Sequence, residues 1–225
     1  MIDHLISLIS KEFEKRIKKL GEEWNEEDLL PSHAQSSTKN GVTEAIMIWS
    51  RLLQSKWKAP FNGFLNKKGK RSFSISRCSP TRYCSFEFCA GELSNHLDDL
   101  LDWLEVTKKD LEHSEDLQVL LKIHTEIIQK IIKYLGVIGY KFSKRWMKDV
   151  AKIKCSNIYN QYVENKIKFL QSLLRDEEKI LSFFEENRPP ICEDIKYKII
   201  RLECICSVLF VLNKYFSSFP ENLFF

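Results

Sequence analysis

The sequence predicts an all-α protein, either an irregular multi-helix bundle or a stack that resembles helical repeats, and three observations lead to this prediction. Apolar residues recur once per helical turn over most of the chain. Seven glycines and six prolines among 225 residues are too few for a fold with many tight turns. Hydrophobic residues make up 44% and charged residues 29%, the composition of an ordinary globular protein with one large or two small domains.

The first part of the chain is expected to hold two helices separated by a loop. In the first helix, residues 2–20, apolar side chains recur at every fourth position, and these are Leu5, Ile9, Phe13 and Ile17. We assign residues 1–30 to an N-terminal amphipathic helix, and residues 31–91 to a loop, a helix over 42–57 and a basic, aromatic-rich segment. Residues 60–91 are predicted to form a long basic loop or a small β-hairpin, because Phe73–Ser76 and Tyr83–Phe88 alternate in polarity.

Residues 92–225 are predicted to form the core of the helical bundle. After a helix over residues 97–104, the helix with the strongest apolar spacing is expected to run from Ser114, a suitable N-cap, to Gly136, a suitable left-handed C-cap. Ser143 is expected to cap the next helix. Further helices are predicted over residues 158–174, 180–184 and 193–216. The last of these is apolar nearly all round in its second half, which predicts a position at the centre of the bundle.

The formal net charge of +4 conceals zones of opposite sign. Residues 45–86 contain Lys and Arg but no Asp or Glu, residues 92–126 are mainly acidic, and residues 130–154 are mainly basic. Such zoning concerns partners and solubility rather than the fold. We expect the acidic zone and the second basic zone to contact oppositely charged protein partners.

The basic, aromatic-rich segment, residues 49–88, is a candidate nucleic-acid interface. Cations neutralise phosphates, and aromatic rings stack on unpaired bases. The cations predicted to make these contacts are Lys67, Lys68, Lys70, Arg71, Arg77 and Arg82. The alternative is a solvated loop whose aromatic side chains pack on the bundle, and the segment contains no base-reading motif.

The same segment contains patterns that favour a nuclear phosphoprotein. The run Lys67-Lys68-Gly69-Lys70-Arg71 resembles a short nuclear-import signal. Ser74 follows Arg71 in a pattern typical of basophilic-kinase sites, and Ser79 precedes Pro80 in a pattern typical of proline-directed kinase sites. A phosphate on either serine would place about two negative charges in a cationic stretch.

Cys78, Cys84, Cys89 and His96 are the residues with the right atoms for a zinc site. Their spacing departs from the paired C-x2-C knuckles of structural zinc sites. The alternative is that the cysteines are small buried hydrophobic residues. We therefore expect no cofactor, and keep the zinc site as a minor hypothesis.

No nucleotide-binding, metalloprotease, serine-hydrolase or kinase motif is present, so the sequence favours a protein that is not an enzyme. The chain shows neither a secretory signal nor a run of apolar residues long enough to span a membrane, so we expect no membrane partner. Seven cysteines favour a reducing compartment, the nucleus or alternatively the cytoplasm. We expect an adaptor or scaffold subunit of a multi-protein complex. The alternative is a DNA-binding or other nucleic-acid-associated protein of chromosome maintenance or DNA repair.

Overall fold

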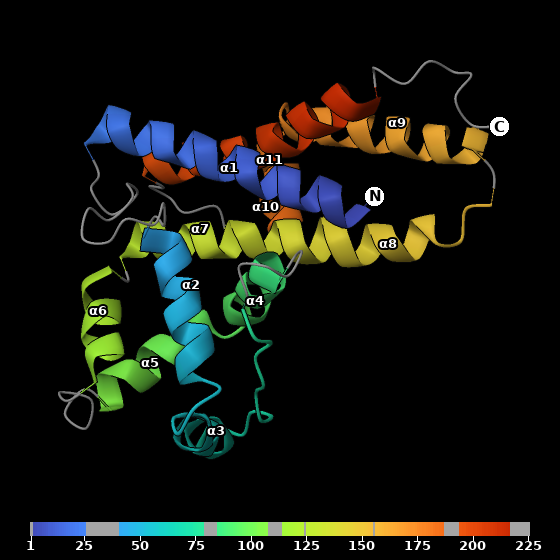
Figure 1. Ribbon diagram of the computed structural model, residues 1–225. Coiled ribbons are helices and arrows are strands. Elements are labelled where there is room, and N and C mark those ends of the chain that lie inside the picture. The colour runs from blue at the N-terminus through green and yellow to red at the C-terminus, as the bar shows by residue number, and fades with distance from the viewer. Residues whose placement is uncertain are drawn as a thin grey trace. The chain divides into compact units, whose positions relative to one another are not determined.

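The computed structural model describes residues 2–25, 41–78, 85–107, 114–123, 125–154, 156–186 and 194–216. Within these ranges the regular structure is entirely helical, which confirms the all-α prediction (Figure 1). The chain divides into two compact units. We call residues 1–17 with 137–225 the terminal unit, and residues 18–136 the central unit. The predicted boundary between residues 91 and 92 therefore lies inside the central unit.

The terminal unit combines the start of the chain with its second half. It contains the first part of α1 (Ile2–Trp24), the π-helix η3 (Ile138–Lys144), α8 (Arg145–Val150), α9 (Ser156–Leu173), α10 (Glu177–Phe183) and α11 (Ile195–Phe216). Helix α9 packs against both α10 and α11. Asp176 caps α10, because its side chain accepts a hydrogen bond from the N–H of Lys179 at 3.1 Å.

The core of the terminal unit is formed by the helix faces that the apolar spacing predicted. On α1 the four predicted residues are buried, and on α11 the buried apolar residues are Ile200, Cys204, Ile205, Val208, Leu209, Val211 and Leu212, whereas Phe210 is exposed. Arg16 joins the two helices through an ion pair with Glu203 at 2.8 Å, while Glu12 accepts from the same guanidinium at 2.9 Å.

The central unit is built from shorter helices around an aromatic core. They are α2 (Gly41–Leu52), α3 (Lys58–Lys67), α4 (Ser85–Ser94), α5 (Leu97–Thr107), α6 (Glu115–Ile123) and α7 (Glu126–Val137). Helix α2 packs against α4 and α6, and α3 packs against α5. Trp49, Phe61 and Trp103 are all at most 1% exposed. The rings of Phe61 and Trp103 meet edge to face, with centroids 5.5 Å apart.

The predicted long loop or hairpin over residues 60–91 is not supported, because α3 and α4 occupy residues 60–67 and 85–91 of that range. No described residue there belongs to a strand. Alternation over a few residues misled the prediction, since the burial of Cys89, Ala90 and Leu93 follows helical spacing. Phe73 and Ile75 are buried and Ser74 is exposed, so the alternation there reflects an extended segment without a partner strand.

The long helix predicted from Ser114 to Gly136 is instead two helices, α6 and α7. Thr125 starts the second, because its hydroxyl accepts from the N–H of Ile128 at 3.4 Å. Gly136 is not a left-handed cap: it lies inside α7, where an added Cβ would stand 2.7 Å from the Ser94 hydroxyl oxygen. Ser143 is not an N-cap either, since it lies within η3 and α8 follows without a break.

Candidate functional site

Residues 70–78 run extended between α3 and the undescribed residues before α4. Their backbone groups bond to side chains rather than to a neighbouring strand. Asn62 accepts from the N–H of Phe73 at 2.7 Å and donates to the carbonyl of Phe73 at 3.1 Å. Glu92 accepts from the N–H and the hydroxyl of Ser76 at 2.6 and 2.9 Å. Side chains of the surrounding helices therefore hold this part of the predicted nucleic-acid interface in place.

Two of the predicted nucleic-acid-binding cations, Lys68 and Lys70, are paired with acids of α5. The ammonium nitrogen of Lys68 lies 2.5 Å from a carboxylate oxygen of Asp102, and that of Lys70 lies 2.6 Å from one of Asp99. Burial of Asp99 disfavours its charged form, but the two ammonium groups outweigh burial and hold the pKa of Asp99 below its ordinary value. These lysines are therefore engaged within the protein.

The same pairing between the basic and the acidic zone joins α2 to α6, where Arg51 lies 2.7 Å from Asp116. Part of the charge zoning is thus satisfied inside the central unit rather than offered to a partner. The predicted cations that are exposed and have no ion pair with a described residue are Lys67, Arg71 and Arg77. Arg82 lies outside the described residues.

Three aromatic side chains of residues 49–88 belong to the core. Trp49 and Phe61 are fully buried, and Phe73 is 9% exposed with its ring 6.0 Å from that of Phe61. Buried rings cannot stack on bases, so these aromatic residues serve the packing of the central unit. Trp57 and Phe64 are half-buried.

The predicted phosphorylation sites are only partly described. Ser74 is exposed on the extended segment, and Lys58 donates to its hydroxyl at 3.5 Å. A phosphate on Ser74 would therefore meet a cation of α3. Ser79 lies outside the described residues, and phosphorylation of both serines remains a prediction.

The structure brings together two of the four predicted zinc ligands. The thiols of Cys78 and Cys89 are neighbours, and the Ser50 hydroxyl accepts from the N–H of Cys78 at 2.9 Å. The Cys78 thiol and burial raise the pKa of the Cys89 thiol, which therefore stays protonated at neutral pH. Cys84 lies outside the described residues.

His96, the fourth predicted zinc ligand, packs its ring against Phe73, with centroids 4.4 Å apart. Its Nδ1 lies 3.7 Å from the Asp99 carboxylate. The described ranges contain no group of three or more His, Cys, Asp or Glu side chains placed to hold a metal ion. The zinc site remains a prediction that depends on Cys84.

The terminal unit contains a cavity of about 350 Å³ beside α9, which we call the α9 pocket. Its floor is formed by the buried Phe142 of η3 and Leu170 of α9, and its wall by Phe169 and Phe183. Phe183 lies 5.6 Å from Phe142 and 6.1 Å from Phe169, measured between ring centroids. A π-helix is rare and is often found near functional sites, and here it supplies one side of the pocket.

The rim of the α9 pocket is mainly cationic. Lys141, Arg145 and Lys166 stand there with one acid, Glu185. Lys141 is engaged: it donates to the carbonyl of Phe183, lies over that ring at 4.8 Å and is 3.5 Å from Glu185. Arg145 and Lys166 have no ion pair with a described residue, so their charges remain available to a ligand.

Tyr162 stands one turn before the pocket residue Lys166 on α9. Its hydroxyl donates to the Asp149 carboxylate at 3.0 Å, and Lys166 lies over its ring at 5.1 Å. Burial, together with the neighbouring carboxylate, raises the pKa of Tyr162 above its ordinary value. The phenol therefore stays neutral and acts as a hydrogen-bond donor.

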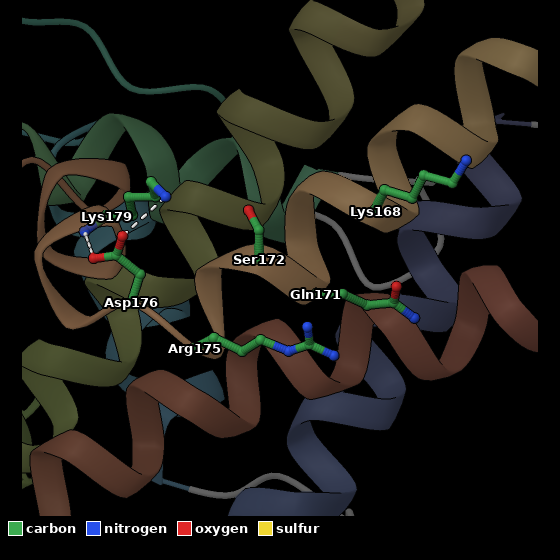
Figure 2. A pocket seen from close by; sticks show the side chains of 6 residues that line it. All are labelled: Lys168, Gln171, Ser172, Arg175, Asp176 and Lys179. Atoms are coloured by element: carbon green, nitrogen blue, oxygen red, sulfur yellow. Dashed lines mark hydrogen bonds and ion pairs between the residues drawn. The ribbon is translucent and has the colours of Figure 1, made fainter.

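A second depression, of about 500 Å³, lies on another side of α9 and is polar; we call it the α9 polar groove (Figure 2). Figure 2 shows Lys168, Gln171 and Ser172 along α9, with Arg175, Asp176 and Lys179 beyond its end. Ser172 donates to the carbonyl of Phe169 at 2.7 Å, and Lys179 pairs with Asp176 at 2.9 Å. The groove has no apolar floor, so it offers a ligand less burial than the α9 pocket.

The sequence pattern predicted α9 but not the pocket beside it. The apolar spacing over residues 158–174 and 180–184 predicts helices of the bundle and gives no indication of a cavity between them. The available signal was Phe169 next to the core residue Leu170, because adjacent positions are about 100° apart on a helix and cannot both face the core centre.

Among the described helices, none is both long and apolar enough to cross a membrane. Comparisons of the chain with family models, with curated proteins and with solved structures found no match.

Proposed function

We propose that this protein is a non-enzymatic adaptor or scaffold subunit that joins a multi-protein complex through its terminal unit. The observation that supports the proposal is the exposure of large apolar side chains on α9 and α11. Ile158 is 56%, Phe169 45%, Ile195 71% and Phe210 45% exposed. Apolar surface gains free energy when a partner covers it.

The spacing of these residues strengthens the argument. Ile158 and Phe169 are eleven positions apart, which is close to three full turns, so they lie on the same side of α9. Tyr162, half-buried, lies between them on that side. An apolar stripe that a helix shows to solvent is the usual recognition element of helix-mediated protein contacts.

The chemistry of the thiols fits a protein without catalysis. Cys204 is fully buried, and burial raises the pKa of its thiol. Cys89 is buried with a raised pKa as well. Nucleophilic cysteines need the opposite, a lowered pKa in a partly exposed setting.

The adaptor proposal is tested by the size of the native assembly. The protein, tagged at its own locus, is expected to elute from a sizing column ahead of the purified chain alone. Mass spectrometry of that fraction should find the same partner proteins in stoichiometric amounts. Elution as a lone monomer at native concentration, or turnover of a substrate by the pure chain, would contradict the proposal.

We further propose residence in the nucleus, on the basis of residues 67–71. Lys67 and Arg71 are exposed there, while Lys68 and Lys70 are paired with α5. A fluorescent fusion carrying Lys67→Ala and Arg71→Ala should shift toward the cytoplasm, and a fusion with Lys56→Ala and Lys58→Ala should not. Equal distribution of the two fusions would argue against the proposal.

A second candidate function is binding of nucleic acid through the central unit. It is supported by Lys67, Arg71 and Arg77, which are exposed and without an ion pair among the described residues. Each phosphate contact contributes about 0.9 to the slope of log affinity against log salt on duplex DNA. Neutralising the three residues should therefore flatten that slope by nearly three. An unchanged slope would remove this candidate.

A further inference from the structure

We infer that the α9 pocket is the docking site for an acidic, helix-forming segment of a partner protein that inserts one aromatic or leucine side chain. This inference rests on the proposed adaptor function and names the partner chemistry of that function. Three features carry it: an apolar floor, cations on the rim that no described carboxylate neutralises, and an exposed apolar stripe that leads to the pocket.

The floor and wall define what the ligand must insert. Phe142 is 4% and Leu170 1% exposed, so two buried apolar side chains line the bottom of the pocket. Phe169 and Phe183 also line the cavity, with their ring planes at 59° to one another. A single large apolar side chain can be buried there without losing a hydrogen bond.

The rim defines the charge of the ligand. Arg145 and Lys166 come from different helices, α8 and α9, and approach the opening from two sides. Lys141 adds a third positive charge to the rim. The carboxylate of Glu185, which is 81% exposed, is the negative charge there. A carboxylate on each side of the inserted residue would meet these cations, and electrostatic complementarity of this kind sets specificity and association rate.

The stripe defines the shape of the ligand. Ile158 and Phe169 on one side of α9 span about three helical turns. A partner helix lying along this side would cover both residues with apolar positions spaced three or four apart. A single-stranded nucleic acid fits less well, because Ile158 has no ring for base stacking and only a few cations are present for phosphates.

The test is a peptide selection on the full-length chain. Phage displaying random 16-residue peptides are selected on the wild type and counter-selected on the variant Arg145→Glu/Lys166→Glu. Arg145 is exposed, and the half-buried Lys166 has no ion pair with a described residue, so the variant is expected to keep its circular-dichroism spectrum and melting temperature. We expect wild-type-specific peptides rich in Asp and Glu, with Phe, Trp or Leu repeated at three- or four-residue intervals.

The matched control is Lys168→Glu/Arg175→Glu, which makes the same change of charge in the α9 polar groove. Lys166 and Lys168 are about 200° apart around the helix, so the control leaves the pocket unaltered. A selected synthetic peptide should lose at least about tenfold in affinity on the pocket variant and less than about twofold on the control. Phe169→Ala should also weaken it, without changing the salt dependence.

Several results would overturn the inference. They are recovery of no wild-type-specific peptide, selected peptides that are neutral or basic, equal weakening by the control variant, and a 12-nucleotide single strand that displaces the peptide at lower concentration. Concentration-dependent dimerisation that Phe169→Ala abolishes would also overturn it, since a second copy would then be the occupant. In all these cases a native assembly on the sizing column would still support the adaptor function.

Discussion

The central and terminal units use the same kind of amphipathic helix but differ in what they leave on the surface. Among the described residues, the central unit exposes one large apolar side chain, Val106, whereas the terminal unit exposes Ile158, Phe169, Leu174, Ile195 and Phe210. In the central unit, three residues of the basic zone form ion pairs with residues of the acidic zone: Arg51, Lys68 and Lys70. The difference shows that charge zoning along a sequence is not by itself a sign of a charged partner.

Residues 49–88 have the more obvious sequence pattern for ligand binding, but they are a weaker candidate site than the α9 pocket. Residues 49–88 draw attention through their cations and aromatic residues, yet Trp49, Phe61 and Phe73 are core residues. Around the α9 pocket, fewer cations are present, but Arg145 and Lys166 are not neutralised by a described residue. A binding site needs charged side chains that have no ion pair within the protein. The density of charge along the sequence does not show which side chains these are.

The largest expected effect concerns Arg201, a buried cation of the terminal unit that is paired with a carboxylate. Arg201 is 1% exposed and lies 3.0 Å from Glu186, itself 7% exposed. Arg201→Met should lower the free energy of unfolding by about 3–5 kcal/mol, because it removes the guanidinium that lies next to a largely buried carboxylate. Urea denaturation followed by circular dichroism measures this.

Adding Glu186→Leu to Arg201→Met provides the control for that measurement. The double variant should recover part of the lost stability, since no charge then remains buried. A double variant less stable than Arg201→Met would show that loss of the ion pair with Glu186 does not cause the lower stability.

The next effect tests how tightly the central unit is packed. Gly136→Ala would place a Cβ 2.7 Å from the Ser94 hydroxyl oxygen and 3.0 Å from the Cα of Gly91. We expect a loss of about 1–3 kcal/mol, because the backbone of Gly91 cannot move aside as a side chain could. Gly63→Ala, on a helix with nothing within 4 Å, should instead stabilise the protein slightly. Equal effects at both glycines would contradict the close approach of α4 and α7.

A smaller effect tests the internal pairing of charges in the central unit. Asp99→Asn should cost about 1.5 kcal/mol at neutral pH, because it weakens charge-assisted bonds to Lys70 and Lys68, both of which are partly exposed. Asp98, exposed on the same helix, is the matched position, and Asp98→Asn should leave stability nearly unchanged. Thermal unfolding of both variants measures the two losses of stability. Equal losses would contradict the role of the Asp99 ion pairs.

The pH dependence of the Asp99 contribution has a defined sign. Its pKa in the fold is below the ordinary value of 3.8, so the stabilisation is complete at neutral pH and is lost as pH falls through the folded pKa. The stability difference between wild type and Asp99→Asn should therefore be constant above about pH 5 and shrink in more acidic solution. A difference that grows toward low pH would exclude the ion pair as its source.

The smallest effect compares the ends of two helices. Helices α3 and α10 end with the same two backbone hydrogen bonds, which close over a residue with positive φ. That residue is Gly69 in the central unit and Glu185 in the terminal unit. Glu185→Gly should raise the free energy of unfolding by about 1 kcal/mol, and Gly69→Ala should lower it by a similar amount. A destabilising Glu185→Gly would mean that its contact with Lys141 outweighs the backbone strain.

The helices were predictable because their signal is local, and the errors have local causes too. Spacing of Leu5, Ile9, Phe13 and Ile17 defined α1, and the apolar second half of α11 defined its burial. The split between α6 and α7 was missed because the apolar face continues across Thr125, whose hydroxyl starts a new helix. The hairpin was a misreading of four-residue alternation, which is too short to separate strand from helix.

The sequence by itself determined the helical class, the faces that are buried and the zones of charge. The tertiary structure alone decided which charges meet, since Lys70 reaches Asp99 across 29 positions and Arg51 reaches Asp116 across 65. It also decided that Gly136 is a packing contact and that η3, α9 and α10 enclose a pocket with cations on its rim. The physical reason is range: helix periodicity is set by neighbours within four residues, whereas pairing and cavity formation depend on residues far apart in the chain.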